Sequence, residues 1–166
     1  MNIFYNSPAS RIVLGVALVL ISPFFSFAQI QHGGQPLGWG EPWEQNLTWN
    51  TFESLDLEAL AAEDAVTATM KDAPWRFGIE HEVNWNMENS GQWSEEDGFR
   101  VWRLPIRAEG AKSWSFYLSR FVVPKGGELF VWNLERTHYL GSFNHLNVKE
   151  WEGLALSLIE GEQVVL

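Results

Sequence analysis

The chain has 166 residues, no cysteine and a formal net charge of -10. This length suits one domain, and the lack of cysteine excludes disulfides and thiolate metal sites. The acidic balance argues against nucleic acid and anionic lipid as partners, because both carry negative charge. The core must come from apolar side chains, above all from 10 Trp and 11 Phe.

Residues 1–28 are predicted to form a secretory signal peptide. Arg11 precedes an apolar run over residues 12–27, and Ser26-Phe27-Ala28 has the small-x-small form of a cleavage site. The mature protein is therefore expected to be secreted or held at the cell surface, with no membrane attachment after cleavage. The alternative is an uncleaved anchor, because the run approaches the length of a spanning helix. Pro23 and the small residues at the site favour cleavage.

Residues 29–53 are predicted to form an irregular N-terminal arm. Gly and Pro recur throughout this stretch, and they interrupt helices and strands. Three tryptophans lie between them, so the arm is expected to cover the body through aromatic side chains: Trp39, Trp43 and Trp49.

A helix of about two turns is predicted for residues 56–64, with Ser54 as its N-cap. Asp56 and Glu58 would lie near its N-terminus, where carboxylates are stabilising. Three leucines are expected to contact the body: Leu55, Leu57 and Leu60.

The first strand is predicted for residues 75–87. Apolar, aromatic or imidazole side chains occupy every second position, with polar residues between them, and a period of two indicates one buried and one solvated face. The residues of the buried face would be Phe77, Ile79, His81, Val83, Trp85 and Met87.

Further alternation predicts strands at 99–107, 113–119, 129–134, 137–143, 154–158 and 163–166. Pro105 lacks a backbone donor, so its strand is expected at a sheet edge or with a bulge. The run at 163–166 ends on apolar residues and is expected to leave an exposed edge. We infer from this that the sequence is a truncated form of a longer protein. The alternative is a natural terminus closed by a short strand.

Residues 54–166 are thus predicted to form an all-β domain. Short strands at regular spacing with Gly-containing turns indicate an antiparallel β-sandwich of jelly-roll type, with one short N-terminal helix. A parallel α/β fold would need helices between strands, and the gaps after Trp75 are too short for them.

Several segments, in order, resemble one protein family. They are Gln-Ile-x-His-Gly-Gly-x-Pro-Leu at 29–37, Leu-Asp-Leu-Glu-x-Leu-x-Ala-Glu-Asp at 55–64, Trp-Arg-Phe-Gly-Ile at 75–79, Asn-Ser-Gly-x-Trp at 89–93, Val-Trp-Arg-Leu-Pro-Ile at 101–106, Gly-Ala-Lys-Ser at 110–113, Pro-Lys-Gly-Gly-Glu-Leu-Phe-Val-Trp-Asn at 124–133 and Leu-Gly-Ser-Phe at 140–143. This pattern is similar to the N-terminal region of secreted lysyl-endopeptidase-like, trypsin-type serine protease precursors of Gram-negative bacteria.

The resemblance implies a β-rich module that precedes a protease domain. It implies export by a type IX route, and a partner in the protease domain of the same precursor, which is missing from this chain. No serine here has the Gly-Asp-Ser-Gly-Gly setting of trypsin-like enzymes, so no catalytic residue is transferred and the chain itself is predicted not to be an enzyme.

No cofactor or metal site is predicted. Glu80-His81-Glu82 offers zinc ligands, but on a strand His81 would point away from both glutamates, so a half-buried histidine is the favoured interpretation. The acidic turn at 95–97 lacks the alternating spacing of a calcium loop and is interpreted as a solvated hairpin tip.

Five tryptophans lie outside the regular runs: Trp39, Trp43, Trp49, Trp93 and Trp151. Exposed indoles could contact a partner's apolar surface or stack on sugar rings. The alternative function is therefore a carbohydrate-binding β-sandwich module with polysaccharide as its partner. The simpler interpretation is that these residues cover the open ends of the sandwich.

Overall fold

The computed structural model describes residues 30–40 and 47–166. By its internal contacts the chain divides into Met1–Ile30 and Gln31–Leu166, and the fold described here is that of the second unit. The predicted signal peptide lies outside the described residues. Within the part that is described, no helix has the length and hydrophobicity of a membrane span.

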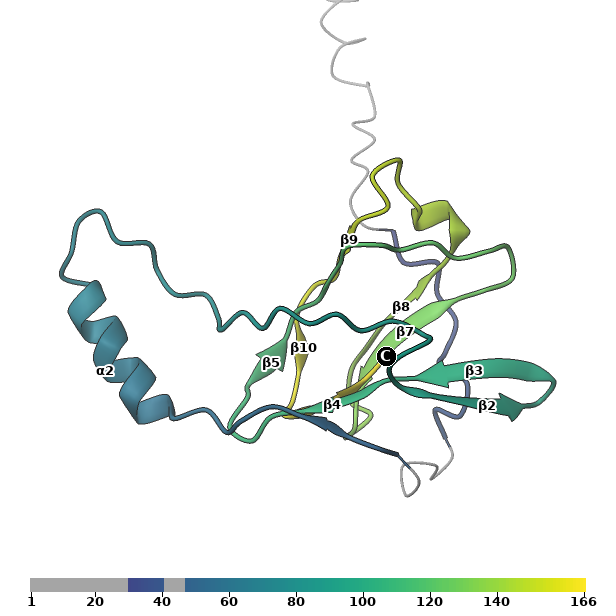
Figure 1. Cartoon of the computed structure of the whole chain (residues 1–166), viewed down its shortest axis with the longest axis horizontal. Helices are drawn as coiled ribbons and strands as arrows, with labels where there is room; N and C mark the ends of the chain where they lie inside the picture. Colours follow the sequence, from purple (N-terminus) through teal and green to yellow (C-terminus); the bar gives the residue numbers. More distant parts are fainter. Residues whose placement is uncertain (1–29, 41–46) are drawn as a thin grey trace, which may run out of the picture. The chain divides into compact units, whose positions relative to one another are not determined.

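The main element is a five-stranded sheet with the order β1-β4-β11-β7-β8 (Figure 1). Its strands are β1 (Asn50–Thr51), β4 (Pro105–Arg107), β11 (Gln163–Val165), β7 (Leu129–Asn133) and β8 (Tyr139–Phe143). All neighbours are antiparallel except β1, which runs parallel to β4. The hairpin of β7 and β8 confirms the predicted strands at 129–134 and 137–143.

Three two-stranded ribbons complete the strands of the described residues. They pair β2 (Gln92–Glu96) with β3 (Phe99–Arg103), β5 (Ser113–Trp114) with β10 (Ile159–Glu160), and β6 (Tyr117–Leu118) with β9 (Leu154–Ala155). A single 3-10 turn, η2 (His145–Asn147), follows β8. The described chain is thus mostly sheet with one α-helix, which confirms a β-rich fold.

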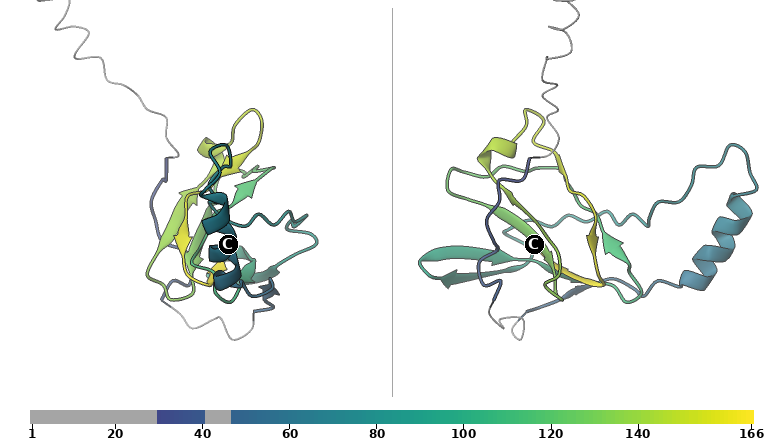
Figure 2. Two further views of the ribbon diagram at one scale, coloured as in Figure 1. Left: turned by 90° about the vertical axis from the view of Figure 1, so that its left-hand side faces the viewer. Right: turned by 180° about the vertical axis from the view of Figure 1, so that it is seen from behind.

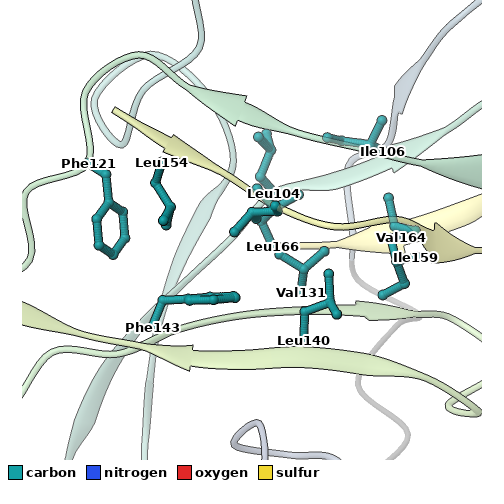
Figure 3. Packing of buried hydrophobic residues seen from close by; sticks show 11 residues of the cluster. Leu104, Ile106, Phe121, Val131, Leu140, Phe143, Leu154, Ile159, Val164 and Leu166 are labelled. Atoms are coloured by element: carbon teal, nitrogen blue, oxygen red, sulfur yellow. The ribbon is translucent and has the colours of Figure 1, made fainter. Parts of the chain in front are cut away.

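The core is a cluster of buried side chains contributed by the large sheet and by the chain that carries the β5-β10 and β6-β9 ribbons (Figure 3). Strand alternation places every second side chain in the core. The burial of each large aliphatic side chain stabilises the folded state by roughly 1.5–3 kcal/mol. Partly buried Trp114, Phe116 and Leu118 pack against this core, as their predicted alternation requires. The buried members are Leu104, Ile106, Phe121, Val131, Leu140, Phe143, Leu154, Leu156, Ile159, Val164 and Leu166.

The predicted strand at 99–107 is two strands, and Pro105 is not at an edge. It is the first residue of β4, an interior strand, and it lies opposite Val165. Leu104 and Leu166 exchange both backbone hydrogen bonds, at 2.9 and 3.1 Å. The next pair along the ladder, Pro105 and Val165, is therefore a non-hydrogen-bonded pair, in which a missing N–H removes no bond to β11.

The expected exposed edge at 163–166 is also wrong. β11 lies in the sheet interior between β4 and β7, and Val164 and Val165 are both fully buried. An interior strand covered on both faces is apolar without alternation, which explains the continuous apolar run at its end.

The predicted first strand at 75–87 does not form. Residues 75–86 have no regular secondary structure and pair with no strand of the described chain, and Trp75 and Phe77 are 90% and 84% exposed. A segment with alternating residues becomes part of a sheet only when a neighbouring strand pairs with it, and no strand of the described chain pairs with this segment. Its second half reaches the body, where the His81 ring packs at a tilt against Phe52 and Trp85 packs against the core.

The predicted helix is confirmed as α2 (Leu57–Thr67), but its cap and its packing differ from the prediction. Asp56, not Ser54, is the N-cap, and its carboxylate accepts a hydrogen bond from the Ala59 N–H at 2.9 Å. Of the three leucines expected to contact the body, Leu55, just before the helix, does so through its backbone bond to Glu109. No residue of α2 itself is buried, and Leu57 is 40% exposed, so the helix does not pack on the body through an apolar face. Figures 1 and 2 show this helix without a strand packed on it.

The N-terminal arm covers the free edge of β8. The backbone N–H of His32 donates to the carbonyl of Ser142 at 2.9 Å, and the N–H of Ser142 donates to Gly33 at 3.1 Å. The Tyr139 hydroxyl donates to the carbonyl of Gly34, and its ring meets Trp39 edge-on. Backbone pairing, as well as aromatic packing, therefore closes this edge.

Candidate functional site

The most exposed apolar surface of the described chain lies on residues 56–80, which we call the α2 loop. Leu55 binds the body just before it, where its N–H donates to the Glu109 carbonyl at 3.1 Å. The His81 ring, whose centroid lies 4.4 Å from that of Phe52, fixes the chain just after it. Between these points the hydrogen bonds and ion pairs of the loop join its own residues.

The α2 loop is braced internally by Arg76. Its guanidinium contacts the Glu63 carboxylate at 2.6 Å and the Asp64 carboxylate at 3.1 Å, so the segment after the helix is tied back to it. The hydrogen bond with Glu63 raises the pKa of Arg76, and both carboxylates add to this effect. The loop therefore has local order despite its lack of contact with the body.

Large apolar side chains of the α2 loop face solvent. Trp75 and Phe77 are the extreme cases, and the others are Leu57, Val66, Met70 and Ile79. Folded monomers rarely leave such residues together on their surface, and sets of this kind mark interaction sites. The arrangement suits a partner protein with a complementary apolar surface.

Four of the five tryptophans predicted as contacts lie in the described residues, and these four belong to different elements rather than to one site. Trp39 is half-buried against Tyr139, with ring centroids 5.1 Å apart. Trp49 is half-buried too, and the Arg107 guanidinium lies 5.8 Å from its ring centroid. These two therefore have a packing role, whereas Trp43 lies outside the described residues.

The other two predicted tryptophans are exposed but belong to different elements. Trp93 is on β2, where the Arg100 guanidinium lies 4.7 Å from its ring centroid and its indole N–H donates to the Met87 carbonyl. Trp151 lies between η2 and β9 and is 71% exposed. Among the predicted tryptophans of the described chain, Trp151 alone is both largely exposed and without a ring or guanidinium contact.

The histidine and the acidic tip have ordinary structural roles. His81 is exposed rather than half-buried, because the strand expected to hold it is absent. In the predicted acidic tip, Glu95 and Glu96 belong to β2, and the hairpin turn is Asp97-Gly98, with positive φ at both residues. Glu96 is half-buried rather than solvated as predicted. No group of three or more His, Asp or Glu residues in the described chain could hold a metal ion.

Sequence reasoning missed a partly buried ion pair between the two strands of the β2-β3 hairpin, which also bonds to the N-terminal arm. Arg103 is 4% exposed, and its two terminal nitrogens both contact the Glu96 carboxylate, with Nη2 at 2.7 Å. Nη2 also donates to the carbonyl of Leu37 in the N-terminal arm at 3.3 Å. Arg103 therefore ties the β2-β3 ribbon to the arm.

The Arg103 hydrogen bond holds the pKa of Glu96 below its usual value, with Ser94 assisting. A carboxylate whose pKa is lower in the folded state stabilises above its unfolded pKa of about 4.3, and this stabilisation is lost as the pH falls through the folded value. We expect Glu96→Gln to cost about 1–2 kcal/mol at neutral pH. Urea unfolding should show this cost shrinking below about pH 4.

The matched control for this prediction is Glu95→Gln, on the exposed side of the same strand. It should change the free energy of unfolding by less than about 0.5 kcal/mol at either pH. An equal cost of Glu96→Gln at pH values above and below the carboxylate titration would contradict the assigned ion pair.

Comparison with known proteins gives no family assignment. No protein-family model matches this sequence, and no solved structure matches the chain.

Proposed function

We propose that this protein is the non-catalytic pro- or accessory module of a secreted lysyl-endopeptidase-like serine protease, exported by a type IX route, and that its α2 loop docks on the protease domain of the same precursor. The observation that carries the docking role is the exposure of Trp75 and Phe77, at 90% and 84%, on an internally braced loop. The ordered segments that resemble the N-terminal regions of such precursors support the choice of partner.

The proposed architecture is a two-layer sandwich of jelly-roll type. The five-stranded sheet would be one layer, and the chain that carries the β5-β10 and β6-β9 ribbons would be the other. The support is the placement of Trp114, Phe116 and Leu118, which come from the ribbon side and pack on the core that the sheet encloses.

The physical basis for docking is the low cost of ordering the loop. Side chains and loops lose conformational entropy when they become ordered on binding, and this loss weakens the affinity. The loss is smaller for a segment that is already held by the contacts of Asp56 and Arg76. Buried aromatic residues carry much of the binding energy at protein interfaces. Trp75 and Phe77 would fill apolar pockets of the partner.

The double variant Trp75→Ser/Phe77→Ser tests this proposal. Because both side chains are exposed, the free energy of unfolding should change by less than about 0.5 kcal/mol. The affinity for the protease domain encoded by the same gene should fall by more than about tenfold, as measured by calorimetry.

The matched control is Leu146→Ser, which removes a side chain that is also exposed but lies on η2. It should leave the affinity unchanged. Equal binding by the double variant and the parent would exclude the α2 loop as the docking surface. A stop codon directly after Leu166, with no protease gene nearby, would contradict the proposed partner.

A further inference from the structure

Two exposed aromatic side chains approach the same glycine at one end of the β6-β9 ribbon. Tyr117 and Trp151 are 70% and 71% exposed. A Cβ atom at Gly153 would lie 2.8 Å from the Tyr117 hydroxyl oxygen and 2.9 Å from Cδ1 of the Trp151 indole. Both side chains therefore converge over the backbone of Gly153. We call Tyr117, Trp151 and Gly153 the aromatic platform.

The backbone beneath the platform is fixed on both sides. Tyr117 lies opposite Ala155 in the β6-β9 ladder. The N–H of Glu152 donates to the Lys149 carbonyl at 2.9 Å, and the Glu152 carbonyl accepts from the N–H of Phe121. The turn that carries Trp151 is thus hydrogen-bonded to the segment that follows Tyr117. Both aromatic side chains therefore extend from backbone that is held in place by hydrogen bonds.

The rim of the platform is polar. Arg120 and Glu152 form an ion pair with Nε and Oε2 3.3 Å apart, and the side chain of Arg120 is 80% exposed and that of Glu152 47%. The Tyr117 hydroxyl and the Trp151 indole N–H have no hydrogen-bond partner within the described chain. The surface therefore combines ring faces with unused donors and acceptors, a combination that suits a ligand with apolar faces and polar edges.

We propose that the aromatic platform binds a neutral, extended polysaccharide, with a pyranose ring stacked on Trp151 and its hydroxyl groups bonded to Tyr117 and to the Arg120–Glu152 pair. A pyranose presents C–H groups on its face and hydroxyls around its edge, which matches the rings and the rim. The net charge of -10 disfavours an anionic polymer. An open surface, unlike the concave pockets that enclose small ligands, contacts one face of a chain.

The test is an NMR titration of the isotope-labelled protein with cellohexaose and with chitohexaose, both extended β-1,4-linked chains. The indole N–H signal of Trp151, assigned from its loss in Trp151→Ala, should shift with a dissociation constant on the order of 1 mM. Trp151→Ala should weaken binding by about tenfold or more, followed through the backbone signals of residues 117–121.

Gly153→Ala provides a second variant that does not remove an aromatic ring. Its methyl group would meet atoms of two exposed aromatic side chains rather than backbone, and both rings would have to rotate away from it. The fold should therefore persist while binding weakens by about threefold or more. The control Trp75→Ala removes a more exposed tryptophan from the α2 loop and should leave sugar binding unchanged.

Three outcomes would overturn the proposal: no shift with either oligosaccharide, binding that Trp151→Ala leaves intact, or binding of helical maltohexaose alone. Because the platform and the α2 loop share no residue, the double variant at Trp75 and Phe77 separates a failure of this site from a failure of protease docking.

Discussion

A chain that lacks residues 163–166 is expected not to fold. These residues supply β11, which bonds to both β4 and β7, and they bury Val164, Val165 and Leu166. Loss of three such side chains removes roughly 5–8 kcal/mol of apolar burial, which is comparable to the whole stability of a typical domain. Circular dichroism and urea titration should show no cooperative unfolding transition.

The control for this deletion is Leu158→Ala in the same C-terminal segment. Leu158 is 44% exposed, so its truncation should cost less than about 1 kcal/mol and preserve the transition. A cooperative transition of near-parental midpoint in the shortened chain would contradict the interior position of β11.

Gly91→Ala is expected to destabilise the domain by about 3 kcal/mol, because backbone strain and a steric clash act together. Gly91 has a φ of +73°, and a Cβ atom there would lie 2.5 Å from the Arg103 carbonyl oxygen and 2.6 Å from Nε1 of Trp102. The indole cannot move freely, since its N–H donates to the Ser90 carbonyl at 2.8 Å. Urea unfolding followed by tryptophan fluorescence measures the loss.

Gly98→Ala separates the two causes. Gly98 has a similar φ of +82°, but a Cβ atom there meets nothing within 4 Å. In Gly98→Ala only the left-handed backbone conformation therefore lowers the free energy of unfolding, by about 1 kcal/mol. Equal losses in the two variants would show that the contact with Arg103 and Trp102 contributes nothing.

Local features could be predicted from the sequence. The β7-β8 hairpin joins neighbouring strands, and α2 is specified by helix-forming residues behind an acidic cap, so both are encoded within short windows. The alternation of Trp114, Phe116 and Leu118 also gave the correct inner face, although the strand breaks where it changes partner from β10 to β9.

Features that depend on spatial neighbours could not be predicted. The alternation at 75–87 carries no information about a missing partner strand, and the apolar residues of 163–166 do not reveal that β11 inserts between β4 and β7. The Arg103 site draws Glu96 and Leu37 from separate segments. For the aromatic platform, the signal overlooked was Tyr117, a large ring on the polar side of its alternating run.

The interior position of β11 also constrains when the domain can fold. The sheet pairs residue 50 with residue 106 and residue 106 with residue 164, so its contacts are remote along the chain. Such a topology has high contact order and slow formation, because long loops must close before the contacts stabilise them. The ribosome must synthesise residues 163–166 before the sheet can be completed. Until then the nascent chain exposes aggregation-prone apolar segments that chaperones would have to shield.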